Sequence, residues 1–489
     1  MNIEIRDVLI AVRGTVESVD VENTALRRRI LGVSTDSRED MGGKLFVPLK
    51  GPKFDGHDYI GAAIEKGAAA VLTERRDVCA ADILSAAKSV AKSGMQGDPC
   101  VIIHVESTYQ ALRDLAEWHR ARFDIPAVAI TGSAGKTTTK DMIASVLSQR
   151  FVTLKTDGNL NNEIGLPLMA LRLNDTHEAA VFEMGMNHLG EIRNLSKIIK
   201  PHVCVITNIG TAHMEFLGSR ENILRAKCEI FEHMRRGGAV ILNADDDMLG
   251  KIVSTGTNNI SYGIHNGDMR AINIKMSGDG QRFDVVYKDV IVHELFVPLP
   301  GEHNVLNALA AAAVGFALGL SGECIQEGLR SFPLSKNRME FIRTDRFTII
   351  NDVYNANPQS MIAALDVLSQ MASYNSVAGR KPQTIAILGD MFELGEFSQA
   401  HHEQIGRHAA ELGIDYLITI GKAADFIRQG FINNNKDNGG HSLSFAAKEE
   451  AEDALPKFEE FLQQGDIILI KASRGMQLET TVAKVKEMS

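Results

Sequence analysis

A short apolar run that leads into a glycine-containing loop, and then into a helical pattern, is the feature that most constrains how this chain folds. Residues 127–130 read Ala-Val-Ala-Ile, residues 131–139 read Thr-Gly-Ser-Ala-Gly-Lys-Thr-Thr-Thr, and a helix is predicted over 136–149. A buried strand, a tight turn and a helix in that order form the βα unit of a parallel sheet. The pattern therefore predicts an α/β fold with the loop at the carboxyl edge of its sheet.

The same loop is suited to binding a phosphate. Gly132 and Gly135 lack Cβ atoms, so successive backbone N–H groups can face one anion at the positive end of the following helix. Lys136 adds a charge for the β- and γ-phosphates, and the hydroxyl of Thr137 is suited to Mg²⁺. The standard spacing needs glycine where this chain has Ile130, so the loop is a shorter variant, and a glycine-rich turn with a surface lysine is the alternative. We predict that ATP contacts Thr131, Gly132, Ser133, Ala134, Gly135, Lys136, Thr137 and Thr138.

Apolar runs alternate with helical patterns along most of the chain. In the middle, strands are predicted over 127–131, 179–183, 203–208 and 239–243, and helices over 188–199, 219–234 and 305–320. A second series after Pro333 has strands predicted over 347–352, 384–388, 416–420 and 466–471. Such alternation predicts parallel sheets with helices on both faces. Alternating β patterns over 263–299 predict hairpins instead.

The chain is too long for one hydrophobic core. At about 100–200 residues per domain, 489 residues predict three domains. We expect a smaller N-terminal α/β domain over 1–106, and a central domain over 107–333 with a doubly wound, mostly parallel sheet and added hairpins. A Rossmann-like α/β domain is expected over 334–489.

Composition excludes several classes of protein. The net charge of −10 argues against nucleic acid as a partner, and no apolar run reaches the ~18–20 residues of a membrane span. The charged start, residues 1–7, does not resemble a secretory signal. Five scattered cysteines without a CxxC pair fit reduced thiols. We therefore expect a cytoplasmic protein that does not insert into a membrane.

Three polar clusters follow predicted strands, where a doubly wound fold gathers its ligand site. The segment 158–167 holds the amides Asn159, Asn161 and Asn162, which suit a polar ligand or simply form the loop. Glu183 ends a strand beside the phosphate loop, a natural place for a carboxylate ligand of Mg²⁺. His213 follows the next strand, and a lone histidine there is more often a packing or surface residue.

Taken together, these segments resemble the Mur ligase family of peptidoglycan synthesis. The resemblance covers essentially the whole chain and rests on the order TGSAGKTTT, GNLNNEIGLP, EMGMNHLGE, TNIGTAHMEFLG, RAKCEIF, GEHNVLNALAA and NDVYNANP. The motifs are most similar to those of members that use ATP to join D-alanyl-D-alanine to UDP-N-acetylmuramoyl-tripeptide through an acyl phosphate. The resemblance implies a monomer with those two small-molecule substrates.

The resemblance also implies roles for single residues. Lys136 and Thr137 would bind ATP and Mg²⁺, and Glu183 and His213 would hold a second metal together with Lys227. Lys227 matches a lysine that reacts with CO₂ to become a carbamate in relatives; from its residue type alone it would be a solvated helix lysine. The implied catalytic residues are thus Lys136, Glu183, His213 and Lys227.

Further residues are implied to contact the nucleotide and the substrates. Asn304 and Asn307 match residues that touch adenine, although they could also cap a helix. Arg338, Asp352 and Tyr354 would reach the nucleotide from the last domain, so domain closure is expected to bring them to Lys136. Asn355 and Asn357 would border the site, and 389–395 and 471–475 would shape the site of the incoming amine.

The N-terminal segments STDSR and GKLFVPLKG resemble the UDP-sugar module of the family. This implies substrate contacts from Ser37, Arg38, Lys44 and Phe46, with Arg38 offering a guanidinium fork to a diphosphate. An ordinary turn is the alternative.

Two other functions stay open: a related ligase that adds one amino acid or a glutamate chain, and an NTPase switch. The switch would need a Walker-B aspartate and has no use for the amide-rich loop.

Overall fold

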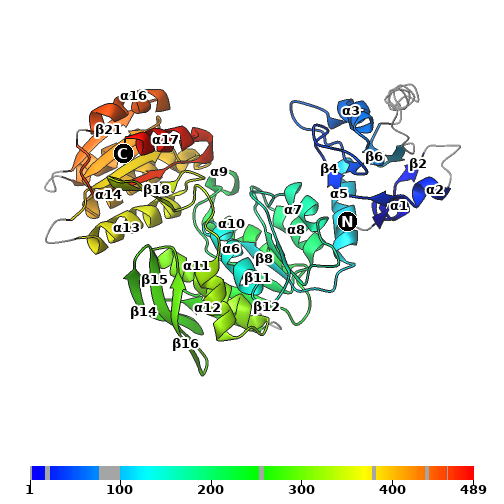
Figure 1. Ribbon diagram of the computed structural model, residues 1–489, viewed down its shortest axis with the longest axis horizontal. Coiled ribbons are helices and arrows are strands. Elements are labelled where there is room, and N and C mark those ends of the chain that lie inside the picture. Colours follow the sequence, from blue (N-terminus) through cyan, green and yellow to red (C-terminus); the bar gives the residue numbers. More distant parts are fainter. Residues whose placement is uncertain are drawn as a thin grey trace.

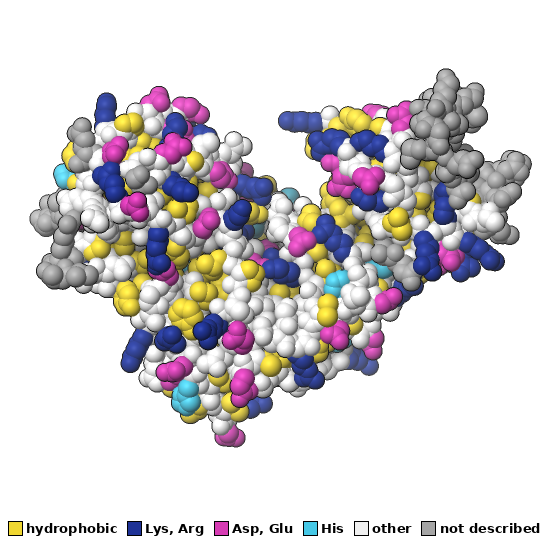
Figure 2. Space-filling model, viewed as in Figure 1, with side chains coloured by type: hydrophobic (Ala, Val, Ile, Leu, Met, Phe, Trp, Pro, Cys, Tyr) yellow, Lys and Arg dark blue, Asp and Glu magenta, His cyan; other side chains and the backbone are white. Residues whose placement is uncertain are grey.

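The computed structural model describes residues 3–16, 23–75, 100–252, 258–376, 381–435, 440–459 and 461–488. They form three α/β domains, and the two outer domains stand on either side above the central one (Figure 1). The surface is hollowed between the outer domains (Figure 2). None of the described helices combines the length and apolar character that crossing a bilayer requires. The predicted three-domain α/β class is confirmed.

The N-terminal domain has a small sheet in the order β2-β7-β6-β5-β4, parallel except for β2. Its described elements are β1 (Ile3–Glu4), α1 (Ile5–Val12), β2 (Thr15–Val16), α2 (Asn23–Leu26), β3 (Arg29–Ile30), β4 (Val33–Ser34), β5 (Leu45–Phe46), α3 (Ile60–Glu65), β6 (Ala70–Thr73), β7 (Val101–His104) and α5 (Thr108–Arg120). Helix α5 leads from this domain into the central sheet.

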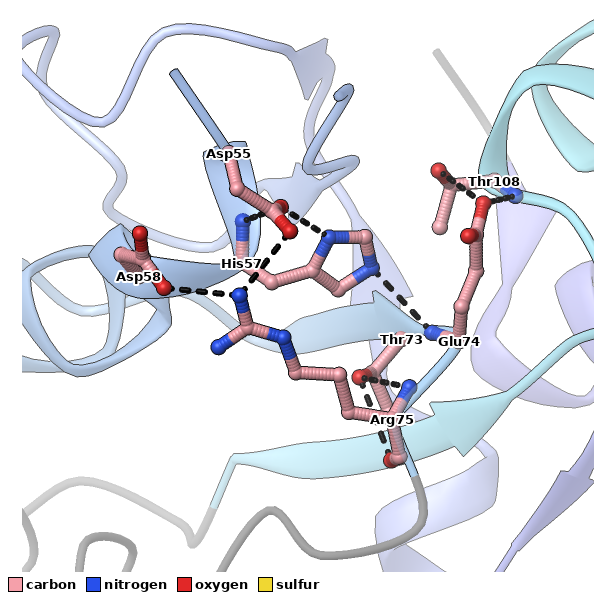
Figure 3. A network of polar contacts seen from close by, with 7 residues as sticks. All are labelled: Asp55, His57, Asp58, Thr73, Glu74, Arg75 and Thr108. Carbon is pink, nitrogen blue, oxygen red and sulfur yellow. Dashed lines mark hydrogen bonds and ion pairs between the residues drawn. The ribbon is translucent and has the colours of Figure 1, made fainter. Parts of the chain in front are cut away.

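A partly buried polar network joins residues 55–75 to the start of α5 (Figure 3). Asp55 accepts hydrogen bonds from the backbone N–H and Nδ1 of His57 at 2.9 and 2.7 Å, and pairs with Arg75 at 2.9 Å. Nε2 of His57 accepts the Glu74 N–H at 3.2 Å, and the Glu74 carboxylate accepts from the N–H and hydroxyl of Thr108. Both ring nitrogens of His57 are therefore used to hold the domain, so this histidine and aspartate pair is structural.

The central sheet has the order β16-β15-β14-β13-β12-β11-β8-β10-β9. It is parallel from β9 to β14, and β14, β15 and β16 are antiparallel, as predicted for 263–299. Its described strands are β8 (Ala127–Thr131), β9 (Thr153–Lys155), β10 (Ala179–Glu183), β11 (Val203–Ile206), β12 (Ala239–Asn243), β13 (Asn258–Gly263), β14 (Met269–Ser277), β15 (Gly280–Tyr287) and β16 (Val290–Val297). Its helices are α6 (Lys136–Leu147), α7 (Gly165–Ala170), α8 (Glu191–Ile199), α9 (Met214–Leu217), α10 (Arg220–Cys228), α11 (Glu302–Ala317) and α12 (Gly322–Ser331).

The C-terminal sheet has the order β17-β18-β22-β19-β20-β21 and is parallel except for β17. Its described elements are β17 (Glu340–Arg343), β18 (Phe347–Asp352), α13 (Pro358–Tyr374), β19 (Thr384–Gly389), α14 (Ser398–Glu411), β20 (Tyr416–Ile420), α15 (Asp425–Asn434), β21 (His441–Phe445), α16 (Lys448–Glu459), β22 (Asp466–Lys471) and α17 (Glu479–Glu487). One apolar cluster includes residues of β8 in the central sheet, of α11, of α13 and of the C-terminal sheet. The two domains therefore pack directly on each other.

Candidate active site

The phosphate loop lies between β8 and α6, and its glycines are required there. Gly135 has φ +80°, and a Cβ added to it would come within 2.6 Å of Oδ1 of Asn307. A Cβ on Gly132 would collide with the hydroxyl of Thr207. Helix α6 begins at Lys136, so the first N–H groups of the helix have no partner within it and remain available to an anion.

Asn208 shapes this loop, and the sequence reasoning missed it. Its backbone carbonyl accepts the N–H of Ser133 at 3.1 Å, and its side-chain Oδ1 accepts the N–H of Ala134 at 2.9 Å. Thr207 donates its hydroxyl to the carbonyl of Ala134 at 2.6 Å. The available signal was the position of Asn208 at the end of the strand predicted over 203–208, which pairs with β8 as β11.

A cavity of about 530 Å³ opens at the loop and is lined by the central and C-terminal domains together. Most predicted residues line it: Ser133, Ala134, Gly135, Lys136, Thr137, Asn159, Asn161, Asn162, Glu183, His213, Arg338, Asp352, Tyr354, Asn355 and Asn357. The residues expected to meet only through domain closure thus already face one cavity in this structure. Thr131, Gly132 and Thr138 do not line it, and Thr131 instead donates its hydroxyl to the carbonyl of Met184.

Lys136 lies in this cavity and its ammonium is held near the loop. Nζ donates to the carbonyl of Gly132 at 2.7 Å. Burial lowers the pKa of Lys136, an effect opposed by Glu183 and reinforced by the guanidinium of Arg338. A partly desolvated cation at this position attracts a phosphate more strongly than an exposed lysine would.

Glu183 ends strand β10 and is 2% exposed. Its Oε1 accepts a hydrogen bond from the side-chain amide of Asn161 at 2.8 Å, whereas its buried Oε2 has no partner among the described residues. Asn162 has a different task, because its Oδ1 accepts the N–H groups of Ile164 and Gly165 at the start of α7. A buried carboxylate oxygen without a donor is what a hard cation would occupy.

His213 lines the same cavity as this carboxylate. Its backbone is left-handed, with φ +64°, and it precedes α9. Nδ1 lies 2.8 Å from Oε2 of Glu393, which belongs to the C-terminal domain. Burial lowers the pKa of His213, and Glu393 opposes that shift. Glu393 is a second site residue that the sequence reasoning did not name, although it lies in the segment 389–395.

Lys227 is 1% exposed, so the alternative of a solvated helix lysine is wrong. Among the residues that the structure describes, no carboxylate pairs with its ammonium. Burial lowers the pKa of Lys227 far below its usual value, and Lys136 adds to the shift. An uncharged amine is the form that such a position favours.

The described residues contain no group of three His, Cys, Asp or Glu side chains placed to bind a metal ion by themselves. The two metal positions predicted here use only two such residues, Glu183 and His213. Thr137 belongs to the first metal, and a modified Lys227 joins Glu183 and His213 at the second. The free Oε2 of Glu183 and the buried Lys227 fit that mixed set.

Asn304 and Asn307 lie behind the phosphate loop and do not line the cavity. Both are buried: Asn304 donates to the carbonyl of Pro300 at 2.8 Å, and Asn307 donates to Oδ1 of Asn304 at 3.1 Å. Oδ1 of Asn307 also accepts the hydroxyl of Thr139 at 3.0 Å. In this structure the two amides therefore brace α11 against α6.

The C-terminal side of the cavity carries a second charged group. Asp352 and Lys471 end neighbouring parallel strands, and Nζ of Lys471 donates to Oδ2 of Asp352 at 2.5 Å and to the carbonyl of Asn355 at 3.0 Å. The guanidinium of Arg338 stacks 3.8 Å from the ring centroid of Tyr354. Both segments predicted to shape the amine site, 389–395 and 471–475, contribute lining residues.

A separate cavity of about 370 Å³ lies between the N-terminal domain and the residues around α7. Lys44 lines it, while Ser37 and Arg38 do not. Arg38 pairs with Asp36 at 2.7 Å, and hydrogen bonds from Arg38 lower the pKa of Asp36 to about 2. Phe46 is predicted to contact the substrate, but its ring is 1% exposed and lies inside an apolar cluster. The packing leaves no face of the ring for a ligand.

Comparison with known proteins agrees with this geometry. Three family models match in order along the chain: Mur ligase family, catalytic domain, at residues 29–120; Mur ligase middle domain, at 130–315; and Mur ligase, glutamate ligase domain, at 337–474. The UDP-N-acetylmuramoyl-tripeptide–D-alanyl-D-alanine ligase of Bacillus subtilis (strain 168) is 38% identical over 485 residues, which cover 99% of this chain and 98% of that protein.

Solved structures extend the similarity to three dimensions. Crystal structure I of MurF from Acinetobacter baumannii has a TM-score of 0.87 at 33% identity and covers 100% of this chain and 99% of its own. MurF ligase from Thermotoga maritima, in complex with ADP, has a TM-score of 0.78 at 27% identity, with 94% and 97% covered. Because the three models follow one another and the relatives align over nearly the full length, the chain belongs to the Mur ligase family.

Proposed function

We propose that this chain is an ATP-dependent amide ligase that joins D-alanyl-D-alanine to UDP-N-acetylmuramoyl-tripeptide, in the cytoplasmic synthesis of peptidoglycan precursors. The observation that carries the proposal is the cavity in which the phosphate loop, Glu183 and His213 face the ends of β18 and β22. The full-length relatives that carry this enzyme name support the choice of substrates.

The reaction has two chemical steps. A terminal carboxylate oxygen of the tripeptide attacks the γ-phosphorus of ATP, ADP leaves, and an acyl phosphate forms. The amino nitrogen of D-alanyl-D-alanine then attacks the acyl carbon, the carbon–oxygen bond to phosphate breaks, and the nitrogen loses a proton. Lys136 and the N–H groups at the start of α6 stabilise the charge on the phosphoryl group as it transfers.

When bound, Mg²⁺ supplies positive charge that offsets the negative charge of the phosphates. Thr137 would hold one ion, and Glu183, His213 and a carbamate of Lys227 would hold a second. The carbamate forms when the neutral amine of Lys227 adds to CO₂ and loses a proton. The carbamate proposal is supported by the burial of Lys227, which has no carboxylate partner in the described part of the chain.

Each of the three domains, with proposed bounds 1–106, 107–333 and 334–489, would supply further contacts to the nucleotide or the substrates. Arg338, Asp352 and Tyr354 would hold the nucleotide from the C-terminal domain, with Asn304 and Asn307 beneath the loop next to the adenine. Ser37, Arg38 and Lys44 would bind the UDP moiety beside the 370 Å³ cavity. Asn159, Asn161, Asn162, Asn355 and Asn357 would border the reacting groups.

Phosphate release measured with purified full-length protein tests the proposal. We expect rapid release only when ATP, UDP-N-acetylmuramoyl-tripeptide and D-alanyl-D-alanine are all present. Equal stimulation by a single L-amino acid with a shorter UDP-peptide would assign the chain to a sister ligase. ATP hydrolysis that ignores both substrates would favour an NTPase switch.

A further inference from the structure

A second cavity, of about 750 Å³, lies between the central and C-terminal domains and shares no lining residue with the cavity at the phosphate loop. One wall comes from β14, β15 and the start of α11. The other is a face of α13 that includes Ala363, Asp366 and Gln370, with Leu412 after α14. In Figure 1, α13 lies above α11 and β15 at the lower edge of the C-terminal domain.

This cavity is not an extension of the proposed nucleotide site. Asn307 of α11 is directed toward α6 and the phosphate loop, whereas His303 and Leu306 line the cavity. Each step along an α-helix turns the side chain by about 100°, so the adjacent residues Leu306 and Asn307 point in different directions. Along α13, Ser360 lines the first cavity and Ala363, Asp366, Gln370 and Tyr374 line the second on later turns.

Among the residues that line this cavity, Gln281 gives the strongest indication of a ligand. It occupies a core-facing position of β15, in alternation with buried Phe283 and Val285, and is only 3% exposed. Its Oε1 is buried and accepts no hydrogen bond from the described residues. A buried carbonyl oxygen without a donor destabilises the fold, so an N–H group from a bound molecule would relieve that cost.

The charges around the cavity indicate which ligands it can bind. Glu302 and Asp366 are its acidic residues, and no Lys or Arg is found among its lining residues in the described chain. Oδ1 of Asp366 accepts from His408 at 2.7 Å, and its side chain is 46% exposed. Burial lowers the pKa of His303 to about 4, so its ring is neutral at physiological pH. A phosphate or carboxylate ligand would meet two acidic lining residues and no Lys or Arg among the described lining residues, which disfavours its binding.

Apolar side chains form the rest of the walls, namely Ile274, Met276, Leu306, Ala363 and Leu412. We propose that this cavity is a second small-molecule site, which takes a flat, largely apolar, neutral or singly cationic molecule whose N–H groups bond to Gln281 and Asp366. Because its walls belong to two domains, an occupant touches both at once and its binding is linked to their relative arrangement.

Benzamidine is a suitable probe, since it combines a flat ring with a cationic amidine that carries several N–H donors. Calorimetric titration of the full-length protein is expected to give one saturable site per chain. Saturating ADP should not displace benzamidine, because the two cavities share no lining residue. Displacement of benzamidine by ADP, or the absence of saturable binding, would overturn the proposal.

Two variants test the location from opposite walls. Gln281→Leu removes the acceptor and should weaken binding about tenfold, the effect of one hydrogen bond. Ala363→Phe fills the cavity from α13 and should abolish binding. Gln399→Leu, an exposed glutamine on α14, serves as the matched control and should bind as wild type. Wild-type affinity in both cavity variants, with unchanged melting temperatures, would place the probe elsewhere and refute the site.

Discussion

Gln359, the second residue of α13, is hydrogen-bonded to Thr211 in the loop after β11. Its Oε1 accepts the Thr211 N–H at 3.3 Å, and its Nε2 donates to the Thr211 hydroxyl at 3.2 Å. Two residues earlier, Nδ2 of Asn357 donates to the carbonyl of Ser133 at 3.3 Å. The C-terminal domain is thus tied by polar contacts to the two loops that form the central half of the candidate active site.

Gln359→Ala should loosen this tie. Without the two hydrogen bonds the domains separate more easily, so small-angle scattering should give a larger radius of gyration, and the KM for ATP should rise severalfold. Gln399→Ala on the surface of α14 is the control and should change neither quantity. Identical scattering curves and KM values for Gln359→Ala would mean that the apolar interface alone holds the domains together.

Lys136→Ala should reduce phosphate release by ~10²-fold or more, because it removes the cation that lies nearest the transferring phosphoryl group. The fold should survive, since Lys136 makes its one described hydrogen bond to the loop itself. Circular dichroism melting checks that point, and Lys197→Ala, at an exposed position of α8, is the activity control. Turnover that stays at the wild-type rate would remove Lys136 from the mechanism.

Asn208→Ala should raise the KM for ATP about tenfold while leaving the melting temperature nearly unchanged. The variant loses both side-chain hydrogen bonds to Ala134, at 2.9 and 3.1 Å, but keeps the backbone bond to Ser133. A loop that is less well organised has to be ordered by the nucleotide, which weakens binding. Steady-state kinetics decide this, and an unaltered KM would show that the backbone contacts suffice.

Lys227→Ala should be nearly inactive and should regain part of its activity when acetate or formate is added. The small carboxylate can occupy the position of the proposed carbamate oxygens next to Glu183 and His213. Lys136→Ala provides the comparison, because no carboxylate replaces its positive charge. Full activity of Lys227→Ala without any added carboxylate would contradict the carbamate, and the ligase assignment would still stand.

The pair His408 and Asp366 should make stability depend on pH. A hydrogen bond to Asp366 raises the pKa of His408 above its ordinary value of 6.5. A group with a raised folded-state pKa contributes stability that is fully present below its unfolded pKa and is lost as pH rises through its folded pKa. Urea unfolding of wild type should therefore lose stability relative to His408→Gln as pH rises above about 6.5. Parallel pH profiles for the two proteins would exclude this linkage.

Much of the fold and part of the candidate site could be read from local sequence. Strands β8, β10, β18, β20 and β22 have the predicted bounds, because continuous apolar runs between turn signals specify buried parallel strands. The phosphate loop could be predicted for the same local reason, since only glycine fits at Gly132 and Gly135. The place of Glu183 at the end of β10 followed directly from the strand.

Tertiary structure decided the contacts between segments far apart in the chain. His213 meets Glu393 and Ser133 meets Asn357 only because two domains pack on each other, and no local pattern encodes that packing. The packing also turns Asn307 toward α6 and buries Phe46 in an apolar cluster, where the family resemblance had implied ligand contacts. Local sequence thus determined which elements form and where their polar ends lie. The burial of apolar faces against distant segments decided which of those side chains face a common cavity.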